Sequence, residues 1–180
     1  MSCLIHYLAP FERIDRLLPA NHAALLRLPP PSKIQQQRIQ QKFAHRIETG
    51  RQPKVHTAAH LCKLICYGNK DNLSAGIIIA GYDPVDGASV YQITQGGSLL
   101  KVPFALSGSG GTYIYGWMDS NFRPDMSRDE ARTFIKRALA HAMARDGSSG
   151  GVIRTVVVSS EGADRDYTPG DALPFGPTGY

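Results

Sequence analysis

Residues 127–145 constrain the fold most, because they predict one amphipathic helix with a defined start. Ser127 and Glu130 form an S-x-x-E capping box, a pattern that satisfies free backbone amides at the beginning of a helix. Apolar residues then recur at helical spacing and define one core face: Ala131, Phe134, Ile135, Ala138, Leu139, Ala142 and Met143. Gly147 ends the helix. The rest of the chain must therefore supply an apolar surface beneath that face.

Two stretches of β-branched residues predict strands on either side of this helix in the sequence. Residues 75–82 form a short, continuous apolar run that is typical of a core strand, and residues 90–94 alternate as its returning partner. Residues 152–159 predict another strand after the helix. Strands in consecutive hairpins, with the helices elsewhere in the sequence, favour an α+β fold with a largely antiparallel sheet.

Further helices are predicted from apolar spacing. Residues 56–67 place Cys62 and Cys66 on their buried side, and a helix begins at residues 113–118. Residues 33–48 repeat apolar positions every four residues after the proline run that closes residues 1–31. We expect residues 1–31 to be a loose tail, with a short helix as the alternative.

The length, the cysteine count and the charge narrow the class of protein. A chain of 180 residues is long enough for one domain with a real core. Its three cysteines are too few for a disulfide framework, which favours a reducing cytosol. Residues 1–54 hold nine Lys/Arg against three Asp/Glu, whereas residues 55–180 hold eleven against twelve. Because the larger part has no excess of positive charge, nucleic acid is not expected as a partner. No apolar run approaches the roughly 18 residues that a membrane helix needs, so a membrane is not expected either.

A zinc site formed by the histidines and cysteines of residues 56–66 is disfavoured by helix geometry. His56/His60 and Cys62/Cys66 are each four residues apart, but His60 and Cys62 lie about 200° apart around a helix. One helix cannot close a tetrahedral zinc site with pairs that face opposite ways, so we interpret them as buried cysteines and exposed histidines.

Residues 147–151 match the G-x-S-x-G pattern of a nucleophile elbow, yet the predicted helix precedes and the predicted strand follows, the reverse of what that motif needs. Residues 108–111 are interpreted as a loop, with an anion cradle as the alternative. The residue pattern alone therefore places Ser109, Asp146 and Ser149 in two Gly/Ser-rich loops. This pattern does not identify a function.

Three long strings together resemble proteasome β-type subunits in sequence, order and spacing. They are TAAHLCKLICYGNKDNLSAGIIIAGYDP, GGSLLKVPFALSGSGGTYIYGWMD and ARDGSSGGVIRTVVVSS. The S-G-S-G and R-D-G-S-S-G-G segments are most similar to the caspase-like subunit. The resemblance divides the chain into a divergent, partly helical segment 1–46, a proteasome β-type domain 47–165 and a C-terminal tail 166–180. It implies the four-layer αββα sandwich of the N-terminal-nucleophile hydrolases, here without its first strands.

The resemblance also implies an activity and a set of site residues. The family is a threonine-type endopeptidase of the proteasome core particle, acting in ubiquitin-dependent protein degradation in cytoplasm and nucleus, and the caspase-like subunit cleaves after acidic residues. Ser109, Asp146 and Ser149 match the family residues that orient the nucleophilic threonine. The implied partners are other α- and β-type subunits in stacked rings and polypeptide substrates, with no cofactor and no metal.

The nucleophile itself has no counterpart in the first part of the chain. Residues 1–46 contain no threonine and no Gly-Ala-Asp segment, and Lys33 lies in a glutamine-rich helical context unlike that of the family lysine. Gly111-Thr112 is the only Gly-Thr pair, and cleavage there would divide the domain. We therefore expect a supporting network without its nucleophile. A non-catalytic structural or assembly-competing variant, or a fragment from an alternative transcript or misjoined gene model, remains the alternative.

Overall fold

The computed structural model describes residues 3–7, 24–26, 54–71 and 76–173, with side chains from residue 54 onward. The predicted helix 33–48 lies outside the described residues. Within them, no helix is both long enough and apolar enough to span a bilayer.

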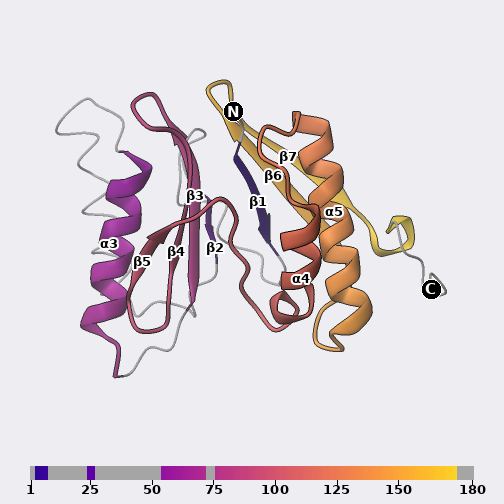
Figure 1. Ribbon diagram of the computed structural model, residues 1–180, viewed down its shortest axis with the longest axis horizontal. Helices are drawn as coiled ribbons and strands as arrows, with labels where there is room; N and C mark the ends of the chain where they lie inside the picture. The colour runs from indigo at the N-terminus through magenta and orange to yellow at the C-terminus, as the bar shows by residue number, and fades with distance from the viewer. Residues whose placement is uncertain (1–2, 8–23, 27–53, 72–75, 174–180) are drawn as a thin grey trace.

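Two sheets lie face to face between helical layers, so the predicted αββα architecture is confirmed (Figure 1). One outer layer is α3 (Val55–Gly68). The next is a sheet in the order β2 (Ala24–Leu26), β3 (Ile77–Asp83), β4 (Gly87–Ile93) and β5 (Leu99–Lys101). The second sheet has the order β1 (Cys3–Tyr7), β6 (Ile153–Ser159) and β7 (Gly162–Thr168). The other outer layer is α4 (Gly111–Asn121) with α5 (Arg128–Arg145), and a short 3-10 helix, η1 (Gly170–Ala172), follows β7.

All strand pairs are antiparallel, as predicted. β3 pairs with β4 from Ile77 opposite Ile93 to Asp83 opposite Gly87, which is the predicted hairpin. Gly87 has a φ of 68°, a backbone conformation that glycine adopts without steric cost, so the turn can close where it does. The second hairpin, β6–β7, brings Ile153 opposite Thr168. β7 extends to Thr168, so the first residues of the predicted tail 166–180 belong to a strand.

The first part of the chain differs from the expected loose tail. Residues Cys3–Tyr7 form β1 along β6, and Ala24–Leu26 form β2 along β3. A sandwich without its first strands, as the resemblance implied, would leave the apolar strand at 75–82 with an unpaired edge. That expectation is corrected, because β2 pairs with Ile78, Ile79 and Ala80 on that edge. The segment was misjudged because its prolines suggest irregular structure, whereas edge pairing needs only a few free backbone amides.

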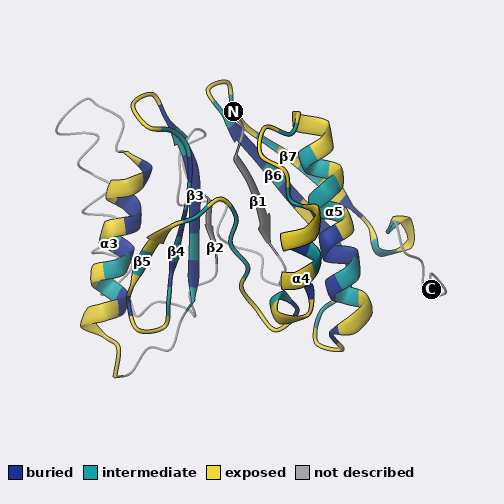
Figure 2. Ribbon diagram, viewed as in Figure 1, coloured by how far each residue is buried: buried dark blue, intermediate teal, exposed yellow. Residues whose placement is uncertain are grey.

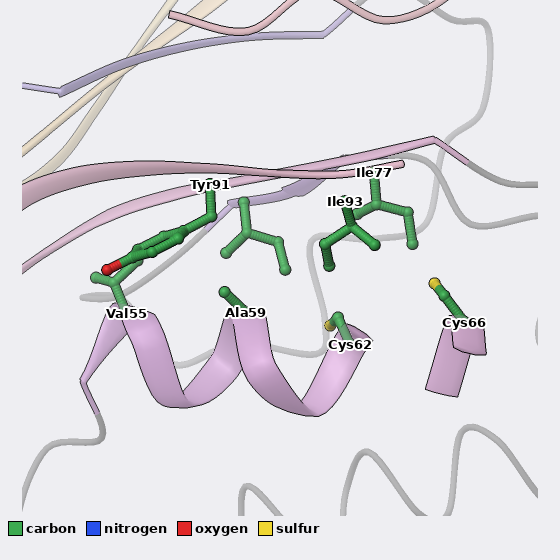
Figure 3. Packing of buried hydrophobic residues seen from close by; sticks show 8 residues of the cluster. Val55, Ala59, Cys62, Cys66, Ile77, Tyr91 and Ile93 are labelled. Carbon is green, nitrogen blue, oxygen red and sulfur yellow. The ribbon is translucent and has the colours of Figure 1, made fainter. Parts of the chain in front are cut away.

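Burial follows the inward faces of the layers (Figure 2). The largest apolar cluster joins α3 to its sheet (Figure 3). Its buried members are Val55, Ala59, Cys62, Cys66, Ile77, Ile79, Tyr91 and Ile93. Between the two sheets, Ala80 packs against Val158. A third cluster joins α4 to α5 through Ile114, Met118, Ala138 and Ala142. This last contact positions the candidate site, because each of these two helices adjoins a loop that carries site residues.

The capping box of α5 is confirmed in both directions. The Glu130 backbone N–H donates to Ser127 Oγ at 3.3 Å, and the Ser127 N–H donates to Glu130 Oε2 at 2.8 Å. Ala138, Leu139 and Ala142 of the predicted face are buried, and Phe134 is half-buried with its ring stacked on Trp117. The helix is therefore fixed at its start by hydrogen bonds and along its length by packing.

Candidate functional site

Asp146 is the centre of the candidate site, and two serine hydroxyls converge on one of its oxygens. Ser109 Oγ donates to Asp146 Oδ2 at 2.7 Å, and Ser149 Oγ donates to the same oxygen at 2.5 Å. Ser109 is 37 residues away in the sequence, so only the tertiary structure brings the three together. Asp146 is 6% exposed, which makes it one of the few buried acidic residues in the described part of the chain.

The backbone around Asp146 holds its carboxylate in place. Asp146 is the C-cap of α5, and its N–H continues the helix by donating to the Ala142 carbonyl at 2.8 Å. The Ser148 N–H donates to Asp146 Oδ1 at 3.1 Å, and the Ser149 N–H donates to the Asp146 carbonyl at 3.0 Å. Helix and turn together therefore fix both carboxylate oxygens before any partner binds.

Ser109 is supplied by the loop between β5 and α4. Gly108 has a φ of 91°, which turns the chain, and the Gly111 N–H donates to the Gly108 carbonyl at 3.2 Å. Thr112 Oγ1 donates to the Ser109 carbonyl at 3.0 Å. Because α4 and α5 run antiparallel, the start of α4 and the end of α5 lie at the same end of the helix pair (Figure 1). This arrangement places Ser109 against Asp146.

The hydrogen bonds determine the charge of the site. The Ser109 hydroxyl, the Ser149 hydroxyl and the Ser148 amide hold the pKa of Asp146 below its ordinary value, so the carboxylate is ionised near neutral pH. A carboxylate with a lowered pKa is a weak base and does not activate either serine as a nucleophile. Each serine oxygen instead keeps lone pairs that can accept a hydrogen bond. The network can therefore orient a donor group, such as an amine, but does not itself attack a carbonyl.

His141 lies on the side of α5 that faces α4. It is half-buried on α5, and its ring centroid lies 5.1 Å from that of Trp117 on α4. Burial, followed by the charges of Arg137 and Arg145, lowers the pKa of His141. α4 therefore covers a second side of α5, besides the face that covers the sheet.

The cysteine and histidine pairs on α3 lie as the spacing predicted. Cys62 and Cys66 are buried in the cluster with the sheet (Figure 3). His56 and His60 are exposed. Burial, together with the neighbouring Cys66 thiol, raises the pKa of Cys62 to about 12, so this thiol stays protonated. Among the described residues, no group of three or more His, Cys, Asp or Glu side chains is arranged to hold a metal ion.

The two glycine-rich segments are both loops. Residues 147–151 follow α5 and precede β6, so the order of elements is opposite to that of a nucleophile elbow, as predicted. Residues 108–110 form the loop that carries Ser109, and Gly111 begins α4. The sequence analysis did not assign a role to Gly110 or to the Ser148 amide. A backbone donor and a close contact leave no residue pattern by which they could be recognised.

Comparison with known proteins identifies the family. Residues 34–158 match the family model described as proteasome subunit. The chain is 54% identical over 130 residues to proteasome subunit beta type-6 of Dictyostelium discoideum. The aligned region covers 72% of this chain and 61% of that protein. It is 53% identical over 123 residues to the probable proteasome subunit beta type-1 of Schizosaccharomyces pombe, covering 68% and 54%. The Saccharomyces cerevisiae subunit beta type-1 is 54% identical over 113 residues, covering 63% and 53%.

This chain therefore belongs to the proteasome subunit family. The relatives it matches are β-type subunits, which confirms the resemblance drawn from the three sequence strings. The chain spans between about half and three fifths of the length of these relatives.

Proposed function

We propose that this chain is a β-type subunit of the proteasome core particle, acting in ubiquitin-dependent intracellular protein degradation. The single observation that carries the proposal is the convergence of Ser109 and Ser149 on Asp146 in a chain of this family. In this proposal the three residues are the supporting network of a threonine-type endopeptidase site that cleaves after acidic residues.

The proposed role of the network is to hold a nucleophile in one orientation. Both serine protons are used by Asp146 Oδ2, so the serine oxygens face any third group as acceptors. An amine or hydroxyl that donates to them is fixed in direction, which lowers the entropic barrier to attack on a peptide carbonyl. Because the Asp146 carboxylate is anchored by the Ser148 backbone amide as well, little reorganisation is needed when that group arrives.

None of the three residues is proposed as the nucleophile. Residues 1–46 contain no threonine. Thr112, which follows a glycine, lies in the first turn of α4, and its hydroxyl is bound to the Ser109 carbonyl. Self-cleavage before Thr112 would cut the chain in the first turn of α4, just after the loop that carries Ser109. We therefore propose that the 180 residues hold the orienting half of the site without its nucleophile.

The proposed partners are other α- and β-type proteasome subunits in a stacked ring, and the proposed substrates are polypeptides. The proposed location is cytoplasm and nucleus. The proposal of other proteasome subunits as partners is supported by the names of these relatives, which are proteasome β-type subunits. The lack of a threonine in residues 1–46 favours a second candidate, a non-catalytic variant that occupies a ring position or competes for it during assembly.

Incorporation is tested by expressing the tagged 180-residue chain in cells and separating core particles from free subunits by size. We expect the tag in the core-particle fractions, together with other subunits. A matched variant, Ile79→Ala, removes packing at the centre of the α3 cluster and is expected to reduce that fraction. Recovery of the folded chain only as a free protein would contradict the proposal.

Activity is tested with a fluorogenic peptide that ends in an acidic residue. The 180-residue chain is compared with a chimera in which the catalytic N-terminal region of a family member replaces residues 1–46. We expect turnover only in the chimera, and a lower kcat when Ser109 or Ser149 is replaced by Ala. If the chain as printed matches the chimera and the same serine substitutions abolish its activity, the proposal of an absent nucleophile is wrong.

A further inference from the structure

Gly110 approaches the site so closely that a Cβ atom there would make tighter contacts than most side chains do. A Cβ atom built on Gly110 would lie 3.0 Å from Ser149 Oγ, 3.2 Å from Ala142 Cβ and 3.3 Å from Asp146 Oδ2. All three distances are shorter than ordinary van der Waals contacts of a Cβ atom. A side chain at this position would thus meet the two polar groups of the site and the helix that supports them.

The backbone conformation does not explain this glycine. Gly110 has φ −69° and ψ −20°, which is the right-handed helical region that every L-residue adopts readily. Gly108, two residues earlier, has a φ of 91° and nothing within 4 Å of a built Cβ. The two glycines of the S-G-S-G loop therefore serve different needs. Gly108 supplies a turn, and Gly110 supplies space.

The glycines beside Asp146 and Ser149 provide the contrast. Gly147 and Gly150 adjoin these two residues in the chain, yet a Cβ on either would meet nothing within 4 Å. An added methyl group at those positions extends into open space. The close approach is therefore made by the loop before α4, which packs onto the loop after α5.

We infer that Gly110 is a positioning residue of the site, whose missing side chain lets Ser109 and Ser149 share one oxygen of Asp146. Ser109 directly precedes Gly110. The 2.7 Å bond from Ser109 to Asp146 therefore depends on how closely the loop before α4 packs against the end of α5. A methyl group on Gly110 would push either the Ser149 hydroxyl or the Ser109 loop away by a few tenths of an ångström, and either shift lengthens or breaks one of the two bonds to Oδ2. The inference rests on the proposed function only in treating this network as part of a peptidase site.

The test follows Asp146 directly in the Gly110→Ala variant of the 180-residue chain. The carboxyl group of Asp146 is titrated by NMR with ¹³C-labelled aspartate, and its signal is assigned by its loss in Asp146→Asn. Since the serine hydroxyls hold the pKa of Asp146 down, loss of either bond shifts the titration upward. Gly150→Ala is the matched control, and its titration is expected to coincide with that of the unmodified chain.

A second variant separates positioning from a general effect on folding. Ser149→Ala removes the oxygen nearest to the added methyl group and is compared with Gly110→Ala/Ser149→Ala. We expect the double variant to titrate like Ser149→Ala alone, because the contact with the Ser149 hydroxyl no longer exists. If Gly110→Ala alone does not fold, recovery of folding in the double variant supports the inference.

The inference is overturned if Gly110→Ala leaves the Asp146 titration unchanged, or if the double variant is as unfolded as the single one. Neither result depends on incorporation into core particles or on peptide cleavage. A chain that fails both tests of the proposed function can still show the upward shift, so the two failures are distinguishable.

Discussion

The two outer layers of the molecule are attached to their sheets by different forces. α3 covers its sheet with apolar side chains, which fit between Ile77, Ile79, Tyr91 and Ile93 (Figure 3). α5 reaches β7 through ion pairs instead. Arg128 and Arg132 both bind Asp164, and Lys136 Nζ lies 2.6 Å from Asp166 Oδ2. One layer is held by burial, and the other combines packing on α4 and on β6 with charge pairs to β7.

This difference determines what can be recognised in the sequence. β3 is an apolar run and was predicted almost to its ends. β7 was not predicted, because alternate residues that turn toward α5 are the acids Asp164 and Asp166 rather than apolar residues. An alternating pattern whose inner positions are charged resembles a solvated loop until the cationic partners on the helix are known.

The largest effect is expected from Ile79→Ala in the apolar layer. Ile79 is fully buried in the α3 cluster, and truncation of such a side chain costs about 2–5 kcal/mol through lost transfer free energy and a residual cavity. Urea denaturation should show a lower midpoint that does not depend on added salt. Val85→Ala, at a position that is 68% exposed, is the control. If Ile79→Ala lowers the urea midpoint no more than Val85→Ala does, apolar burial does not hold this layer together.

A smaller effect is expected from Asp83→Asn, which tests a buried carboxylate in the same part of the molecule. Asp83 is 2% exposed and accepts backbone N–H bonds from Val55 at the start of α3, and from Val85 and Asp86. Burial alone would raise the pKa of Asp83, but the amides of Asp86, Val55 and Val85, with Lys54, outweigh it and lower the pKa. Loss of a charged acceptor for backbone donors costs about 1–3 kcal/mol.

The pH dependence of Asp83 has a definite sign. Because its pKa is lower in the folded protein, its stabilisation is complete above the ordinary Asp value of 3.8 and is lost as the pH falls through the folded pKa. Asp83→Asn should therefore flatten the acid limb of a stability–pH curve measured by thermal melting. A variant with an unchanged acid limb would show that α3 does not depend on this carboxylate.

The smallest effect is expected from Lys136→Met in the charged layer. The partners Lys136 and Asp166 are both partly exposed, with 27% and 33% of their side chains accessible, so the pair contributes about 0.2–1 kcal/mol. Denaturation at low and high ionic strength is the measurement, because screening should remove the difference from the unmodified chain. Arg137→Met, at an exposed neighbouring position, is the control. A salt-independent loss would mean that the methylene stem, and not the charge, matters here.

In the candidate site, too, the sequence predicted the local features but not the contacts between distant residues. The residue pattern placed Ser109, Asp146 and Ser149 in two glycine-rich loops, and the structure has both loops. Only the family resemblance suggested that the loops meet, because 37 residues separate Ser109 from Asp146 and no local pattern reports such a contact. The catalytic role of the three residues stays a prediction. Gly110 could not be recognised at all, since its backbone conformation is ordinary and its significance is the space beside it.

The sequence by itself determined the elements whose cause is local or repetitive. These are the capped helix α5, the apolar hairpin β3–β4 and the burial of the cysteines on α3. Capping and periodicity act within a few residues, so the pattern is complete in the sequence. Only the tertiary structure decided three features. β7 is a strand, the carboxylate of Asp83 accepts a backbone N–H at the start of α3, and two serines share one carboxylate oxygen. Each of these depends on a polar group meeting a partner far along the chain, and polar groups in a sequence do not reveal their partners until packing brings them together.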